Sequence, residues 1–161
     1  MRISIILLII CLLVTISKAT NDNCRQAVDA IERAIAMEDY RKVKTLLSQW
    51  PKTDCKVLQD LYFAEVYLYE GDPETAEQLL QILLNQKLDI LHFYKTQYLL
   101  ALAHIDQAED SMAVAYLDNI LEAKPSSYVY QEALDLRINL HSKQSEHLQA
   151  MQLLKTAFAD A

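Results

Sequence analysis

The sequence predicts an all-α fold, and three observations lead to that prediction. First, the 161 residues include one glycine and three prolines, too few turn formers for the closely spaced strands of a sandwich or barrel. Second, apolar residues after residue 23 recur at intervals of three and four along segments of 12 to 18 residues, which is the periodicity of a helix. Third, these segments resemble one another at regular intervals. A chain of this length makes one domain of paired helices.

Residues 1–19 have the layout of a secretory signal peptide. A charged start with Arg2 leads into an apolar run over residues 3–16, and small residues ending at Ala19 follow it. The run has 14 residues, whereas a helix that spans a bilayer needs about 20. We therefore expect cleavage after Ala19 and export of residues 20–161 to a periplasm or the cell exterior, with no stable membrane span. An uncleaved membrane anchor is the alternative.

The first four periodic segments predict helices over residues 24–36, 40–50, 54–70 and 73–86. Pro51 closes the second helix, because proline cannot continue a helix. Asp54 stands where it can cap the third helix. Asp72, followed by Pro73 at the first helical position, has the same place before the fourth.

The other four segments predict helices over residues 90–106, 110–123, 127–142 and 145–159. Pro125 closes the second of these helices. Ser126 and Ser127 precede the third and Ser145 opens the fourth, where a serine hydroxyl can accept a hydrogen bond from the first turn. Eight helices at such an even pitch indicate an internal repeat.

The repeat is visible when the segments are aligned on their small residues. The anchor positions, separated by 33, 37 and 37 residues, are Val43, Ala76, Ala113 and Ala150. Twelve residues upstream of the anchors stand Ile31, Ala64, Ala101 and Ile138. Four residues downstream stand Leu47, Leu80, Leu117 and Leu154. Small side chains at two matched places let two antiparallel helices cross closely, so each repeat reads as one helix pair.

The two middle repeats resemble the tetratricopeptide repeat family, whose unit is a helix pair of about 34 residues. The resemblance is carried by AEVYLYEGDPETAEQLLQILL in residues 57–88 and by LLALAHIDQAEDSMAVAYLDNILEAKP in the next repeat. The outer repeats depart from the pattern, since Ile31 and Val43 replace the small pair in the first. The resemblance implies a right-handed α-solenoid of about four antiparallel helix pairs. A solenoid family with repeats of 36 to 38 residues is the alternative.

Composition and charge exclude several classes of function. The lone Gly71 rules out phosphate-cradling loops, dinucleotide fingerprints and nucleophile elbows, which need two or more glycines. The whole chain has a net charge of −7, and removal of residues 1–19 leaves 13 basic and 22 acidic residues, a balance of −9. An acidic surface repels phosphate backbones and anionic lipid headgroups, so we expect no nucleic-acid partner.

The sequence predicts neither an enzyme nor a metal or cofactor site. No helix carries two histidines at i, i+4, and no nucleophile stands with a base and an orienting residue. His104 and His141 lie 37 residues apart, in the repeat position held by Tyr67. We expect both to be partly buried packing residues.

A partner-binding groove follows from the resemblance, because first helices in this family line a concave surface. Each first helix has a stripe with i, i+4, i+7 spacing. In the first three repeats the stripe is Val28, Glu32, Ile35, Leu61, Glu65, Leu68, Tyr98, Leu102 and Ile105, with Tyr62 and Tyr69 flanking. The fourth repeat is polar there, with Asp135, Asn139 and Ser142. Packing between repeats explains Ile35, Leu102 and Tyr62 equally well, whereas binding is favoured for Leu61, Tyr98 and Ile105.

These patterns predict a protein-binding adaptor or scaffold. Its groove would hold an amphipathic helix or an extended peptide with apolar anchors and basic flanks. By analogy from fold and export, the setting would be assembly of the bacterial envelope or of secretion machinery. A structural oligomerising module, or a helical enzyme, is the alternative.

Cys24 and Cys55 are the two cysteines that remain after signal cleavage. An even count in an oxidising compartment predicts a disulfide, with two unpaired thiols as the alternative. The repeat alignment places both at the starts of neighbouring first helices, where a bridge would fix the N-terminal helix.

The final helix suggests a homodimer contact. The side of this helix that faces the preceding helix of the same pair is predicted to carry Leu148, Met151, Leu154 and Ala157. Leu153 and Phe158 lie off that side, so they are predicted to contribute to self-association or to the partner contact. Folding of Phe158 back onto Leu134 is the alternative.

Overall fold

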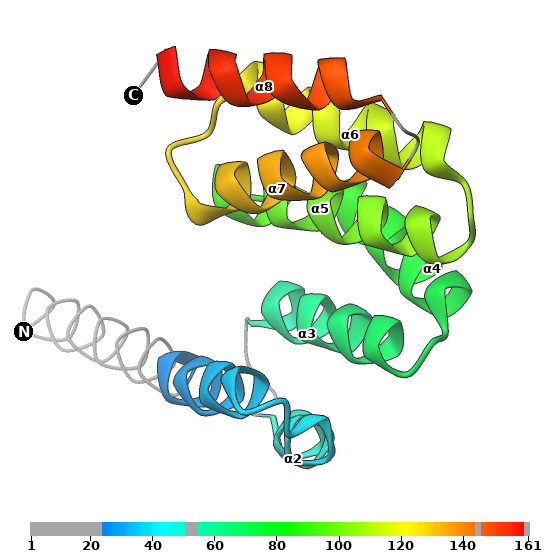
Figure 1. Cartoon of the computed structure of the whole chain (residues 1–161). Coiled ribbons are helices and arrows are strands. Elements are labelled where there is room, and N and C mark those ends of the chain that lie inside the picture. Colours follow the sequence, from blue (N-terminus) through cyan, green and yellow to red (C-terminus); the bar gives the residue numbers. More distant parts are fainter. Residues whose placement is uncertain (1–23, 51–54, 144–145, 160–161) are drawn as a thin grey trace, which may run out of the picture. The chain divides into compact units, whose positions relative to one another are not determined.

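The computed structural model describes residues 24–50, 55–143 and 146–159 (Figure 1). For residues 156–159 it describes the backbone alone. Every secondary-structure element in these described ranges is a helix, which agrees with the predicted fold class. The predicted signal peptide and the predicted cap and stop residues Pro51, Asp54 and Ser145 lie outside them.

The helix bounds lie within two residues of the predicted ones. The first described helix covers residues 24–36. The others are α2 (Tyr40–Ser48), α3 (Lys56–Tyr69), α4 (Pro73–Leu84), α5 (Ile90–Asp106), α6 (Asp110–Ala123), α7 (Tyr128–Lys143) and α8 (His147–Ala159). The chain divides into two compact units, Met1–Val66 and Tyr67–Ala161.

The first unit has its own apolar core. Its buried members are Cys24, Ile31, Ala34, Val43, Leu47, Trp50, Cys55, Tyr62 and Val66. A disulfide joins Cys24 to Cys55, whose Cα atoms are 6.2 Å apart, within the normal range for such a bond. The bond is the predicted pairing, and it ties the start of helix 24–36 to the residue that precedes α3.

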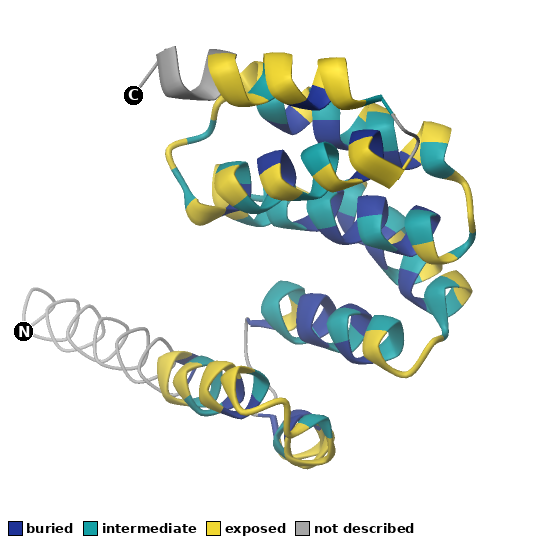
Figure 2. Ribbon diagram, in the orientation of Figure 1, coloured by how far each residue is buried: buried dark blue, intermediate teal, exposed yellow. Residues whose placement is uncertain are grey.

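In the second unit each helix from α4 to α8 packs against the next, and α5 also contacts α7. The buried core under α5, α6 and α7 consists of Ala101, Ala113, Leu117, Ile120, Val129, Ala133 and Leu140. Ala101 and Ala113 are the small pair that the repeat alignment placed at a helix crossing, and both are fully buried. Figure 2 shows this buried band along the inner sides of α5 and α6.

Four turns between paired helices share one hydrogen-bond pattern. The backbone N–H of each N-cap residue donates to the carbonyl five residues earlier, as in a Schellman motif. The donor–acceptor pairs are Asp39 to Ala34 (2.9 Å), Asp72 to Tyr67 (2.9 Å), Glu109 to His104 (2.7 Å) and Glu146 to His141 (2.8 Å). The residue before the cap has a positive φ at Glu38 (55°), Gly71 (75°) and Ala108 (60°). The turns are spaced by 33, 37 and 37 residues, the same as the sequence repeat.

Helix caps agree with the sequence only in part. Asp72 caps α4 as predicted, with its carboxylate accepting from the Thr75 N–H at 3.2 Å. Ser127 precedes α7, but its hydroxyl is buried without a hydrogen-bond partner, so the predicted cap is wrong. Asp39 and Asp89 cap α2 and α5, and the sequence analysis missed both.

Candidate functional site

In the first unit the predicted binding stripe lies largely in the core. Val28 and Ile35 are half-buried against the unit's core cluster, and Tyr62 is a buried member of it. The Tyr62 hydroxyl donates to Glu32 Oε1 at 3.2 Å, which fixes that carboxylate to the same core. Packing therefore accounts for Val28, Ile35 and Tyr62, whereas Glu32 is exposed and is bonded to the core through Tyr62.

Two further stripe residues of this unit, Leu61 and Glu65, offer a partner little surface. Leu61 is buried and Glu65 is half-buried. Binding was the favoured interpretation for Leu61, yet an aliphatic side chain that is already buried adds little area to a contact.

The second unit keeps the predicted stripe on one side of α5. Tyr98, Leu102 and Ile105 are half-buried, whereas Leu99, Leu100 and the other buried residues of α5 face its packed side. Tyr98 and Ile105 also rest against the core cluster. Contacts with α4, α6 and α7 thus leave this side of α5 only partly covered.

The neighbouring helix α7 presents polar side chains at the equivalent positions. Asp135, Asn139 and Ser142 stand 37 residues after the three stripe residues of α5, and all three are exposed. α5 and α7 are in contact, so the half-covered apolar stripe and the polar one belong to neighbouring helices. We call these six residues the α5–α7 face.

Two other predicted groove residues lie near the end of α3. Leu68 is half-buried and Tyr69 is exposed. Both belong to the second unit by sequence.

His104 and His141 each pair with a carboxylate, a contact that sequence analysis missed. The distance from Nδ1 to the glutamate Oε2 is 2.8 Å for His104 and Glu109 and 2.7 Å for His141 and Glu146. Both histidines are buried. Glutamates 109 and 146 are 37 residues apart, as are the histidines, so the shared spacing was the signal for these pairs.

A buried histidine oriented by a carboxylate is also the base of many hydrolases. In this chain the ring of His104 stacks on Tyr116 with centroids 5.6 Å apart, and its Nε2 is buried without a hydrogen-bond partner. A catalytic base must reach a proton of the substrate. The Nε2 atom of His104 is enclosed, and the histidine has the contacts of a packing residue that joins the end of α5 to the start of α6.

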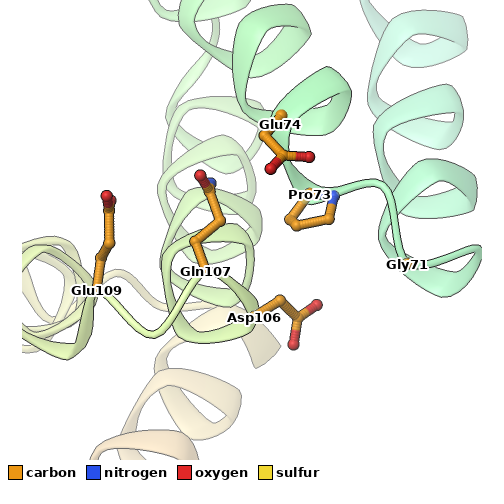
Figure 3. A pocket seen from close by; sticks show the side chains of 6 residues that line it. All are labelled: Gly71, Pro73, Glu74, Asp106, Gln107 and Glu109. Atoms are coloured by element: carbon orange, nitrogen blue, oxygen red, sulfur yellow. The ribbon is translucent and has the colours of Figure 1, made fainter.

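An open hollow of about 540 Å³ lies between two of the turns (Figure 3). Its lining is Gly71, Pro73, Glu74, Asp106, Gln107 and Glu109. The side-chain amide of Gln107 donates to Glu77 Oε2 at 2.9 Å, which holds Gln107 at this edge. Three carboxylates without a lysine or arginine in the lining give the hollow an acidic character. Within the described ranges, no three His, Cys, Asp or Glu residues are grouped so as to hold a metal ion.

The predicted inner side of the last helix needs a correction. Leu148, Met151 and Leu154 were assigned to the inner side of the last helix pair, yet all three are exposed on α8. The inner side instead carries Ala150, which is buried, and Leu153, which is half-buried. The side chain of Phe158 lies outside the described part of the chain.

Comparison with protein-family models, curated proteins and solved structures finds no match for this chain. Among the described helices, none combines the length and the apolar character that crossing a bilayer requires.

Proposed function

We propose that this chain is a protein-binding scaffold that holds an apolar segment of a partner on the α5–α7 face. The half-covered stripe of Tyr98, Leu102 and Ile105 carries the proposal. Aromatic and aliphatic side chains that are anchored in a core but still accessible make good contact points, because little conformational entropy is lost when a partner covers them.

Charge supports a basic flank on that partner. Asp106, which lines the acidic hollow, directly follows Ile105 of the apolar stripe in the sequence. The acidic and apolar features therefore adjoin at the end of α5. The chain as a whole carries a net charge of −7. Complementary charge speeds encounter and selects among partners more than it raises affinity.

A tetratricopeptide-like solenoid of four pairs, exported to the bacterial envelope, is the setting that we propose for this face. The four turns with one hydrogen-bond pattern support the repeat. The predicted leader and the Cys24–Cys55 disulfide support export, since disulfides persist in oxidising compartments. Envelope or secretion-machinery assembly is inferred by analogy and extends the proposal.

A quantitative pull-down tests the proposal. Immobilised protein captures partners from an envelope extract, and mass spectrometry compares wild type with Tyr98→Ala and Leu102→Ala. Each change should lower retention of one specific partner about tenfold, as loss of a contact hot spot does. Met112→Ala is the matched control, because Met112 is an exposed apolar residue on α6 outside the face. Equal capture by all variants, with helicity unchanged, would refute the proposal.

A further inference from the structure

The outer side of α8 is an exposed apolar stripe. Leu148, Met151 and Leu154 are 72%, 67% and 39% exposed, and their i, i+3, i+6 spacing puts them along one side of the helix. Figure 2 shows α8 as the most exposed helix of its unit where side chains are described. Three large apolar side chains in one stripe on a helix mark an interaction surface more often than isolated ones do.

The repeat indicates what would cover this stripe at Met151 and Leu154. Leu154 is equivalent to Leu80 in α4 and Leu117 in α6, both of which are 0% exposed. Leu117 belongs to the core cluster that includes Val129, Ala133 and Leu140 of α7, and the neighbouring Val114 packs against that cluster. The first helix of the following pair thus covers this position in α6. Among the described helices, α7 is the only one that makes an extensive contact with α8.

We propose that the α8 stripe docks one amphipathic helix of a partner protein, in the place that α7 takes on α6. The chemistry of that helix can be read from α7. It needs apolar residues at i, i+4, i+7 and i+11 with a small one at the second position, as in Val129, Ala133, Leu136 and Leu140. This surface is separate from the α5–α7 face and does not depend on the function proposed for it.

A second copy stacked head to tail is a poor occupant. In that arrangement the N-terminal helix of the copy would lie on α8, and the exposed side of helix 24–36 carries Arg25, Asp29 and Arg33. Covering these charges with leucine and methionine would remove their hydration, a cost that their pairing with one another at i, i+4 spacing offsets only in part. A helix of a different protein avoids this cost.

A labelled peptide with the sequence of α7, residues 128–143, is a direct probe. Fluorescence anisotropy with the full chain should show saturable binding at micromolar concentration. Leu154→Glu and Met151→Lys should each weaken that binding about tenfold or more. Ile82→Glu is the matched control, because Ile82 is an equally exposed apolar residue on α4 outside the stripe, and it should leave binding unchanged.

Three results would overturn the proposal. One is no saturable binding up to millimolar peptide. Another is unchanged binding to the Leu154→Glu variant, which would place the peptide elsewhere. The third is a wild-type dimer in sedimentation that Leu154→Glu converts to a monomer, which would assign the stripe to a second copy. If Leu154→Glu loses helicity, Met151→Lys decides, because its side chain is more exposed.

Discussion

Glu109 occupies the N-cap of α6, yet its carboxylate accepts no hydrogen bond from that helix. It reaches back to Nδ1 of His104 instead. At the equivalent turn before α4, the shorter Asp72 caps its helix and the partner position holds Tyr67. The extra methylene of glutamate lets its carboxylate reach back to the histidine, whereas the carboxylate of the shorter Asp72 accepts from the Thr75 N–H of its own helix.

The contact between His104 and Glu109 predicts coupling in a double-mutant cycle. His104→Tyr and Glu109→Asp should each destabilise the fold by about 1 kcal/mol, because each leaves one member of the hydrogen-bonded pair alone. In the double variant the contact is already lost after the first change, so its destabilisation should be about 1 kcal/mol smaller than the sum of the two single losses. Urea unfolding of the four proteins measures the coupling. If the two single changes in the free energy of unfolding simply add up in the double variant, the contact makes no contribution to stability of its own.

The turn positions with positive φ predict opposite effects for two exchanges. Gly71 has φ of 75° and open space where a Cβ would stand, so Gly71→Ala should destabilise through backbone conformation alone. The cost should be about 1 kcal/mol. Ala108 has φ of 60°, so Ala108→Gly should stabilise by a similar amount. Thermal unfolding tests both, and shifts of equal sign would contradict this explanation.

At the scale of elements, α5 depends on the cap at its start. Asp89 Oδ1 accepts from the His92 N–H at 2.9 Å, and Asp89 Oδ2 lies 2.6 Å from His92 Nδ1. The backbone N–H of His92 lowers the pKa of Asp89 from its ordinary value of 3.8; burial is the next largest influence and opposes it, and the His92 side chain lowers the pKa further. The ionised carboxylate is therefore more stable in the folded chain.

Asp89→Ala should destabilise the fold by about 1 kcal/mol at neutral pH, the usual cost of a lost N-cap. The difference in folding stability between wild type and Asp89→Asn should depend on pH. A carboxyl with a lowered pKa adds stability above pH 3.8 and loses it as pH falls through the folded value. Denaturant titrations at pH 7 and pH 2.5 test this. A stability difference between the two proteins that grows in acid would be inconsistent with the cap.

Sequence patterns located the helices well but not all of their faces. Periodicity and end signals such as Asp72 with Pro73 placed every described helix end within two residues. The orientation of α8 was wrong because leucines occupy both sides of that helix, so periodicity alone cannot choose the buried one. Ser127 failed as a cap because its hydroxyl is buried, which depends on packing that sequence does not show.

The repeat spacing selected a half-covered apolar stripe in the second unit but not in the first. Tyr98, Leu102 and Ile105 lie together on α5 as the repeat spacing predicted. In the first unit the same spacing selects Val28 and Ile35, which pack on the core instead. Equivalent sequence positions need not have equal exposure, because the neighbouring side chains of each repeat decide what is covered.

At the scale of the whole molecule, the disulfide should stabilise the first unit selectively. Its cysteines are 31 residues apart, and closing a loop of that size contributes about 3 to 4 kcal/mol in the chain-entropy model. Reduction should therefore lower amide protection in helix 24–36 while α5 to α7 keep theirs. Hydrogen exchange measures this, with a Cys24→Ala/Cys55→Ala variant as the control that dithiothreitol does not alter. Equal loss in α5 to α7 would contradict selective stabilisation.

The central claim is that partners bind on the first-helix side of the second unit. Site-specific photocrosslinking in cells tests it most directly. A benzophenone side chain is placed at Leu102 on α5 or Asn139 on α7, and at the exposed Ile82 on α4 or Met112 on α6 for comparison. The account predicts one common adduct from Leu102 and Asn139 and none from Ile82 and Met112. The same adduct from all four positions, or adducts only from Ile82 and Met112, would contradict it.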